Sequence, residues 1–351
     1  MSKKKDKIAA MSEEEKTQYL AKRKKKRIIT WAIVGSILFV ILLNFLILPL
    51  TGKAFRTKEV IEYTGTNKYI CFDDALMLSA HRAGGDLEPE ETMAAFKLCM
   101  EATDYVVDIV EFDLHLTKDN ELVLLHDDTV NRTSNATEHF GSKKVKAKDK
   151  TLAELKELNF GENFVDPNGN APYKGLRGND IPNDVKITTL DEILTYLTAK
   201  QPTLNYIIEI KDGGKTGEVA MDALYNKMVQ YNIVNQTIVG TFQDNVTRYI
   251  DKKYPSLTRS ASIAEFLDFY YAFLYGNKNK EFKFKVLQIP MGADGIFNFH
   301  SKAFISFAHS KGMAVQYWTI NDADKVKRLK ENGADCIMTD NPSMAYKALH
   351  E

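Results

Sequence analysis

Short apolar runs alternate with longer amphipathic stretches along the chain from about residue 75 onward. The short runs include ALMLSA, VVDIVEFDL, NYIIEI and DCIMTD, and the longer stretches include TMAAFKLCMEA and EVAMDALYNKMVQY. Short apolar runs predict strands, whereas apolar positions spaced at about one helical turn predict helices. Strands that alternate with helices build a parallel sheet, and about eight such units predict an α/β fold with a (β/α)8 TIM-like barrel.

One connection departs from an ideal barrel. Twelve residues lie between Asp113 and His126, which leaves no room for a crossover helix between parallel strands. We therefore expect a hairpin-like pair of strands at this point. The polar segment 127–187 that follows is too long for an ordinary loop, and we expect it to form an insertion or lid over the site.

The N-terminal part of the chain has a different pattern. Residues 1–27 hold eleven Lys or Arg and four acidic residues, and residues 28–50 hold no charge over 23 positions. A helix needs roughly 20 apolar residues to cross a bilayer, so 28–50 predict one transmembrane helix. The basic run KRKKKR before it predicts a cytoplasmic tail and an extracellular domain on the cell membrane. Residues 51–74 are expected to form a stalk or lead-in to a barrel domain over 75–351.

Composition narrows the function classes. With 351 residues, 44% hydrophobic and 27% charged, the chain can build one substantial core, which excludes general disorder. The formal net charge is zero, and the residues after the basic tail are acidic on balance, so we expect no nucleic-acid partner. Three cysteines imply no disulfide framework, and we expect Cys99 and Cys336 to be core residues.

Charged and histidine side chains gather at the ends of the predicted strands, where barrels carry their active sites. Glu111 and Asp113 are two residues apart, so on a strand both side chains point to one face, and Glu209 ends a second strand. Oxygen ligands of this kind suit Ca²⁺ or Mg²⁺. His81 and His126 suit acid–base catalysis, because imidazole titrates near neutrality. Taken alone, each feature is more often a surface or salt-bridged group.

Two cations and one aromatic residue complete the candidate site. Arg82 and Lys211 supply positive charge for phosphate oxygens, or they pair with the carboxylates, and both roles are compatible. Trp318 follows a late strand and is expected to pack on the glycerol or headgroup of a substrate, or in the core. His115 continues the alternation from Asp113, which allows its side chain to face the site, but we assign it no role. The other histidines are expected at the surface: His139, His300, His309 and His350.

Several motifs occur in a fixed order along the chain. They are HR at His81, PEET at 89–92, EFDLHLTKD at 111–119, LLHDDTVNRTS, TTLDEIL, IIEIKD, QYWTIN and GADCIMTDNP. Together they cover nearly all of the chain after about residue 75, and the series resembles the glycerophosphodiester phosphodiesterases. The phosphatidylinositol-specific phospholipases share a barrel and two histidines, but the E-x-D and TDNP segments fit the first family better. Glu91 stands where that family usually has asparagine, which changes the local hydrogen bonding.

The resemblance implies metal carboxylates at Glu111, Asp113 and Glu209 and catalytic histidines at His81 and His126. We assign His81 as base and His126 as acid, although the sequence leaves the two roles interchangeable. The expected reaction is hydrolysis of a glycerophosphodiester, dependent on Ca²⁺ or Mg²⁺, to glycerol 3-phosphate and an alcohol. Water or a glycerol hydroxyl is the attacking oxygen. Alternatives are a lysophospholipid or a glycerol-phosphate wall polymer as substrate, or a weakly catalytic module that binds anionic polymers.

Overall fold

The computed structural model gives a full-atom account of most of the chain. It describes residues 12–42, 63, 65–71, 76–292 and 297–351. Two compact units are present. One contains the N-terminal helix, and the other contains the α/β domain.

The N-terminal helix α2 covers Glu13–Leu42. Its described apolar side chains are exposed, including Ile28, Trp31 and Phe39. Among the described residues, no helix is both long enough and apolar enough to cross a membrane. The last part of the expected span, residues 43–50, lies outside the described residues, as do residues 1–11 of the expected tail and most of the expected lead-in.

Within the described residues, eight strands form one sheet in the order β5-β4-β2-β1-β8-β7-β6, with β3 paired to β2. The strands are β1 (Met77–Ala80), β2 (Ile109–Leu116), β3 (Leu122–Leu124), β4 (Asn205–Ile210), β5 (Thr237–Gly240), β6 (Val286–Ile289), β7 (Ala314–Tyr317) and β8 (Cys336–Thr339). Every pair along this order is parallel, as the alternating sequence pattern predicts.

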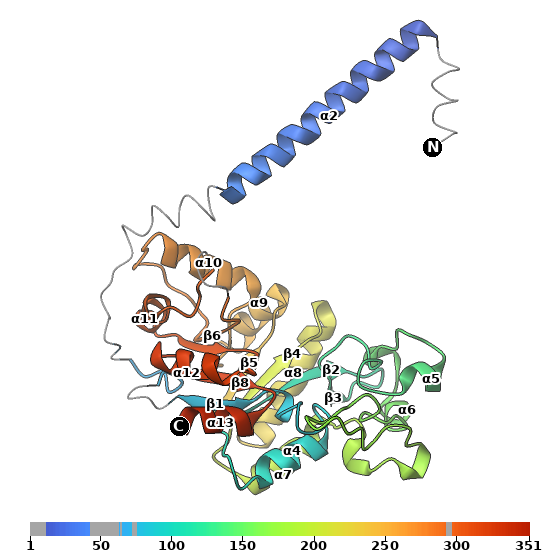
Figure 1. The fold of residues 1–351 in the computed structure, drawn as a ribbon, viewed down its shortest axis with the longest axis vertical. Coiled ribbons are helices and arrows are strands. Elements are labelled where there is room, and N and C mark those ends of the chain that lie inside the picture. The colour runs from blue at the N-terminus through green and yellow to red at the C-terminus, as the bar shows by residue number, and fades with distance from the viewer. Residues whose placement is uncertain (1–11, 43–62, 64, 72–75, 293–296) are drawn as a thin grey trace. The chain divides into compact units, whose positions relative to one another are not determined.

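Helices surround the strands on the outside (Figure 1). They are α4 (Met93–Glu101), α7 (Leu190–Lys200), α8 (Gly214–Gln230), α9 (Asp244–Lys253), α10 (Ile263–Leu274), α11 (Lys302–Ser310), α12 (Ala323–Glu331) and α13 (Pro342–His350). Local sequence sets several of their starts. For α7, Thr189 accepts from the backbone N–H of Glu192, and the Glu192 side chain accepts from the Thr189 N–H in return.

A short extended segment closes the barrel between β5 and β6. Arg259 forms a parallel bridge to Val239 of β5, and Ser260 forms one to Val286 of β6. The Arg259 side chain is buried, and its guanidinium pairs with Asp251 and Glu265. The structure is therefore a nearly closed, parallel α/β barrel, which confirms the predicted barrel fold.

Residues just before β1 pack against the barrel. Tyr69 and Ile70 are buried in a cluster with apolar side chains from the strands. The backbone N–H of Cys71 donates to Asp335 at 2.7 Å, and His309 Nε2 lies 2.8 Å from the same carboxylate. These contacts connect this segment to Asp335, the residue directly before the last strand, β8.

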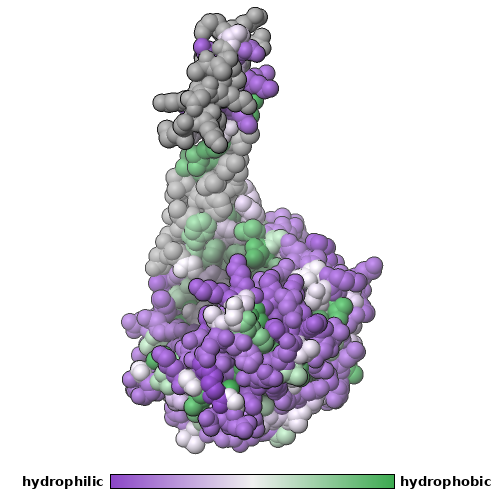
Figure 2. Space-filling view, turned by 90° about the vertical axis from the view of Figure 1, so that its right-hand side faces the viewer, coloured by the Kyte–Doolittle hydropathy of each residue, from purple (hydrophilic) through white to green (hydrophobic). Residues whose placement is uncertain are grey.

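Strand β3 pairs antiparallel with β2, so the predicted hairpin is present. The residues after it form short helices on one side of the barrel (Figure 1), among them α5 (Ala136–Phe140) and α6 (Leu152–Leu155). They enclose a small apolar core that includes Val130, Leu158 and Phe160. Figure 2 views the molecule from this side, and the surface of the α/β unit there is mostly hydrophilic.

Candidate active site

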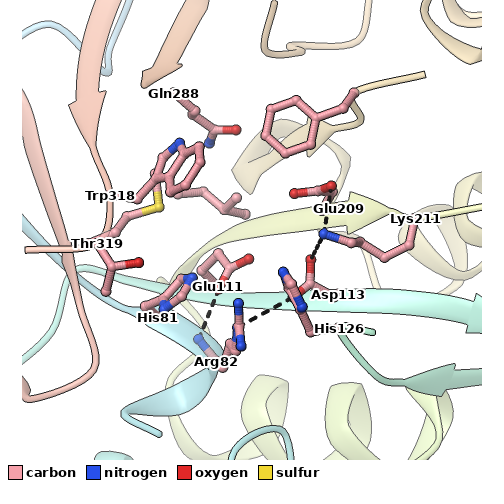
Figure 3. Close-up of a pocket in the computed structure, with 13 residues that line it drawn as sticks. His81, Arg82, Glu111, Asp113, His126, Glu209, Lys211, Gln288, Trp318 and Thr319 are labelled. Carbon is pink, nitrogen blue, oxygen red and sulfur yellow. Dashed lines mark hydrogen bonds and ion pairs between the residues drawn. The ribbon is translucent and has the colours of Figure 1, made fainter. Parts of the chain in front are cut away.

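All eight residues predicted for the site line one pocket with a cavity of about 90 Å³. They are His81, Arg82, Glu111, Asp113, His126, Glu209, Lys211 and Trp318. Most of them lie near or just after the C-terminal end of a strand, where barrels carry their active sites. Glu111 and Asp113 lie within the longer strand β2, at the level where the neighbouring strands β1 and β4 end. Figure 3 shows the acidic and basic groups together on one side of this pocket, with Trp318 on the opposite wall.

The three carboxylates lie on two neighbouring strands. Asp113 of β2 is directly opposite Glu209 of β4 in the parallel register, and Glu111 precedes Asp113 by two residues on the same face. Lys211 Nζ lies 3.0 Å from Glu209 Oε1 and 3.4 Å from Asp113 Oδ1. The register of the sheet therefore fixes which carboxylates meet.

Burial makes this group of like charges unfavourable. Desolvation and the neighbouring Asp113 raise the pKa of Glu111 to about 7 and that of Glu209 to about 8. Burial also raises the pKa of Asp113, but the positive charges of Lys211, His126 and Arg82 outweigh this effect. The net result is a lowered pKa for Asp113. Additional positive charge is what this cluster needs to be fully ionised at neutral pH.

The residues present fit a hard divalent cation. Both oxygens of the Asp113 carboxylate are buried and have no hydrogen-bond partner among the described residues, and the side chain is 1% exposed. Glu111 and Glu209 present further oxygens to the same pocket. Within the part of the chain that the structure describes, however, no three His, Cys, Asp or Glu side chains are already arranged around a common metal position.

Each predicted catalytic histidine is held by a carboxylate at Nδ1. His81 Nδ1 lies 2.6 Å from Asp340 Oδ1, and His126 Nδ1 lies 2.8 Å from Asp127 Oδ1. Burial lowers the pKa of both imidazoles. For His81, Glu111 and Asp340 outweigh this effect and the pKa is raised, whereas for His126 the net direction is down. The two imidazoles thus differ in how tightly they hold a proton.

A guanidinium connects the histidine loop to the other wall of the site. Arg132 lies 2.6 Å from Asp127 Oδ2 through Nε, and 2.8 and 2.6 Å from the two Glu90 oxygens through Nη1 and Nη2. Glu90 also accepts from Arg82 Nη1 at 3.2 Å. The result is a continuous set of contacts from His126 to Arg82.

The backbone after β1 is in the left-handed region at Arg82, with φ 51°, and again at Ala83 and Gly84. This turn directs the Arg82 N–H to Glu111 Oε2 at 2.8 Å. Glu91, also left-handed at φ 59°, is buried, and its carboxyl accepts from the Asp113 N–H at 2.8 Å. Burial raises the pKa of Glu91 well above its ordinary value. The residue that departs from the family motif therefore supports the strand that carries the carboxylates.

Sequence reasoning missed part of this site. Phe242, Gln288 and Thr319 also line the pocket, and Phe242 lies 6.0 Å from the Trp318 ring. Each follows or ends a strand, so their positions were a usable signal, but none has a side chain that suggests chemistry. The carboxylates of Asp127 and Asp340 lay within quoted motifs without an assigned role.

Two expectations for the other histidines are wrong. His300 is 2% exposed and its Nδ1 contacts the carbonyl of Met291, while His309 pairs with the buried Asp335. Both follow polar or helical patterns locally, and tertiary packing buries His300 and partly buries His309. His115 is also buried, and it lines a neighbouring cavity and not the active-site pocket.

Known proteins resemble this chain in sequence and in fold. A family model described as "Glycerophosphoryl diester phosphodiesterase family" matches residues 81–344. The glycerophosphodiester phosphodiesterase of Caldanaerobacter subterraneus subsp. tengcongensis is 29% identical over 267 residues, which is 76% of this chain and 94% of that protein. One from Bacillus subtilis (strain 168) is 23% identical, covering 78% and 86%. An Oleispira antarctica phosphodiesterase, solved with the product sn-glycerol-3-phosphate, has the same fold at TM-score 0.58, 20% identity and coverage of 78% and 97%.

Proposed function

The chain belongs to the glycerophosphoryl diester phosphodiesterase family, and from this premise we propose that it hydrolyses glycerophosphodiesters to glycerol 3-phosphate and an alcohol. It is a phosphoric diester hydrolase. The observation that carries the proposal is the convergence of three carboxylates, two histidines and two cations in one pocket. Such a pocket suits a phosphodiester, because it offers fixed positive charge and two groups that transfer protons.

In this proposal, Arg82 and Lys211 bind the non-bridging phosphate oxygens. Both cations are largely buried, so their attraction to the phosphate is screened less than it would be at the surface. Trp318 and Phe242 provide an apolar wall against which the carbon atoms of glycerol can pack. Gln288 lies on the same side of the pocket (Figure 3) and offers an amide for a glycerol hydroxyl.

We propose Glu111, Asp113 and Glu209 as ligands of Ca²⁺ or Mg²⁺. The Asp113 oxygens, which accept no hydrogen bond among the described residues, and the raised pKa values of the two glutamates support this assignment. When bound, such a cation supplies charge stabilisation for the phosphoryl oxygens. Calorimetric titration with Ca²⁺ and Mg²⁺ tests the assignment: the wild-type chain should bind one of them, and Asp113→Asn should weaken binding at least about tenfold. Equal binding by both proteins would refute it.

The opposite pKa directions favour His126 as the base and His81 as the acid, the reverse of our assignment from sequence. His126 holds its proton less tightly, so it is ready to accept one from the attacking oxygen. His81, beside Asp340, is ready to donate one to the leaving alkoxide. A substrate with p-nitrophenol as leaving group needs no acid. It should therefore restore activity to His81→Ala, whereas restored activity in His126→Ala would reverse the roles.

We also propose that residues 28–50 anchor the protein in the cell membrane, with the tail inside and the α/β domain outside. The uncharged run of 23 residues and the preceding basic run support this. Protease treatment of intact cells should digest the α/β domain and spare an N-terminal tag. Protection of the domain, or recovery of the full-length chain in the fraction without membranes, would refute it.

The substrate class is tested with a panel of diesters. The full-length chain should hydrolyse glycerophosphocholine and glycerophosphoethanolamine, and it should act much more slowly on the counterpart in which ethylene glycol replaces glycerol. Equal rates on glycerol and ethylene glycol diesters would show that the glycerol hydroxyls are not recognised. No turnover of any diester by a folded, cation-loaded protein would refute the proposed function.

A further inference from the structure

A second cavity, of about 220 Å³, adjoins the active-site pocket. Lys211 lines both, and Gln243 of the second cavity directly follows Phe242 of the first. Asp128 likewise follows Asp127, which holds His126. The two cavities are therefore neighbours, with the Lys211 side chain between them.

The second cavity carries more positive than negative charge. Its cations are Lys146, Lys148 and Lys211, and its carboxylates are Asp128 and Asp212. Burial raises the pKa of Asp212, but His115 and Lys148 outweigh this effect and the net direction is down. Asp212 is also occupied on both oxygens, by His115 and by the Leu116 N–H. Lys211 pairs with Glu209 and Asp113, so Lys146 and Lys148 are the groups available to a ligand, and they favour an anion.

His115 gives this cavity a specific polar contact. The side chain is buried, with the residue 5% exposed, and its Nδ1 lies 3.0 Å from Asp212 Oδ1. A carboxylate only accepts hydrogen bonds, so Nδ1 is the donor to Asp212, and Nε2 is left for a second polar contact. Nε2 is buried and has no partner among the described residues. A ligand hydroxyl, which can both donate and accept, would satisfy it.

The lining of the cavity thus suits a ligand that carries both an anionic group and a hydroxyl. We propose that it binds a second glycerol phosphate unit, joined to the one whose phosphodiester is cleaved. The phosphate would lie at Lys146 and Lys148, and a glycerol hydroxyl would form a hydrogen bond with His115 Nε2. This inference rests on the proposed function, and it makes the preferred substrate a molecule with at least two glycerol phosphate units.

Two kinds of molecule contain linked glycerol phosphate units, a lipid headgroup and a cell-envelope polymer, and the experiment tests each of them separately. Bis(glycerophospho)glycerol represents a lipid headgroup without its acyl chains, and a long glycerol-phosphate polymer represents a cell-envelope polymer. Glycerophosphocholine, with one phosphate, is the reference. The test variant is Lys146→Ala with Lys148→Ala. The control is Lys143→Ala with Lys144→Ala, because these lysines are exposed on the same segment and do not line the cavity.

The kinetic result we expect is a raised KM. On each substrate, the control should have the same kcat/KM as wild type. The test variant should lose about tenfold or more on at least one ligand with two phosphates, since each ammonium–phosphate contact contributes a charge-assisted hydrogen bond. Its kcat/KM on glycerophosphocholine should be unchanged. The ligand on which the test variant loses activity shows whether the natural substrate is the lipid headgroup or the polymer. An equal loss on glycerophosphocholine, or an equal loss in the control, would overturn the proposal.

Binding separates this inference from the proposed function. In chains that also carry His126→Ala, equilibrium titration with bis(glycerophospho)glycerol and with the polymer measures affinity without turnover. The two lysine substitutions should weaken at least one of these ligands about tenfold. Unchanged affinity for both would overturn the second-unit site, whatever the wild-type chain hydrolyses. Absence of hydrolysis by wild type would overturn only the proposed function.

Discussion

Arg132 is the residue whose replacement tests the arrangement of the site in most detail. Its guanidinium contacts Asp127 at 2.6 and 3.2 Å and Glu90 at 2.8 and 2.6 Å, and Asp127 in turn holds His126. Arg132 does not line the active-site pocket, so it acts on the reaction by positioning His126. Arg132→Ala removes all four contacts and leaves the Asp127–His126 contact with no support from the other wall.

Two magnitudes follow from this geometry. The Arg132 side chain is about half exposed, so each of its two ion pairs contributes only about 0.5–1 kcal/mol to the free energy of unfolding. We expect Arg132→Ala to lower stability by about 1–2 kcal/mol. A positioned base is worth about 10²–10⁴-fold in rate, and Asp127 retains part of the positioning. The variant should therefore lose about 10- to 100-fold in kcat/KM.

The pH profile separates positioning from general damage. Burial raises the pKa of Asp127, but the bonds from Arg132 and His126 lower it to about 2. Without Arg132, the Asp127 charge is less neutralised, so it should raise the pKa of His126. Activity that needs neutral His126 then appears at higher pH, and the acid limb of the kcat/KM profile should move upward. Arg132→Lys should recover part of the loss, because it restores the charge but not the fork.

A matched control is available in the same insertion. Arg177 pairs with Glu138 and Glu162, away from the site, in a similar two-carboxylate arrangement. Arg177→Ala should lose comparable stability and keep its kcat/KM and pH profile. The reasoning is refuted if Arg132→Ala keeps wild-type kcat/KM, or if both variants lose activity equally.

Three further predictions concern stability. Glu91→Ala should cost about 1–3 kcal/mol in chemical denaturation because it leaves the buried Asp113 N–H unpaired, whereas Glu91→Gln keeps an acceptor and should cost less than about 1 kcal/mol; equal losses would contradict this. Asp335→Ala should lower the free energy of unfolding by about 3–5 kcal/mol, because it removes an acceptor for two backbone N–H groups and for His309. The folded fraction should keep its kcat/KM. A loss of stability below about 1 kcal/mol would contradict this reasoning. The pKa of Asp127 is about 2 in the folded protein, below its unfolded value of about 3.9. The Asp127 charge therefore stabilises the fold above about pH 4, and this contribution is lost as the pH falls toward about 2. The difference in stability between wild type and Asp127→Asn should shrink over that window, and a constant difference would show that the charge is not responsible.

The barrel and its charged groups were predictable from local pattern. Strand ends such as Ala80–His81 and Ile210–Lys211 show a change from apolar to charged residues that sequence alone reveals. In a parallel barrel, all such ends meet at one face, which explains how His81, Arg82, Glu209, Lys211 and Trp318 come to one pocket. Glu111 and Asp113 lie within β2, and the family resemblance was needed to include them and His126 in the site. The hairpin was predictable for a similar reason, because chain length excluded a crossover.

Contacts between distant segments were not predictable in the same way. Arg132 reaches Glu90 across 42 positions, and His81 reaches Asp340 across 259, with no local signal for either. The barrel segment at Arg259 and Ser260 is too short for its sequence to specify its partners. The partners of His115 depend on how Asp212 is held after β4. These contacts depend on tertiary packing, which the local sequence pattern does not indicate.

The most direct measurement is the release of glycerol 3-phosphate from glycerophosphocholine by the full-length chain in detergent. It should be followed with Ca²⁺ or Mg²⁺ present, after chelation, and after the cation is restored. We expect release with the cation, loss with chelator and recovery on restoration, and Glu111→Gln should lower the rate at least about 100-fold while the protein remains folded. A folded, cation-loaded wild-type chain that releases no glycerol 3-phosphate, or whose release is the same after chelation, would contradict the account.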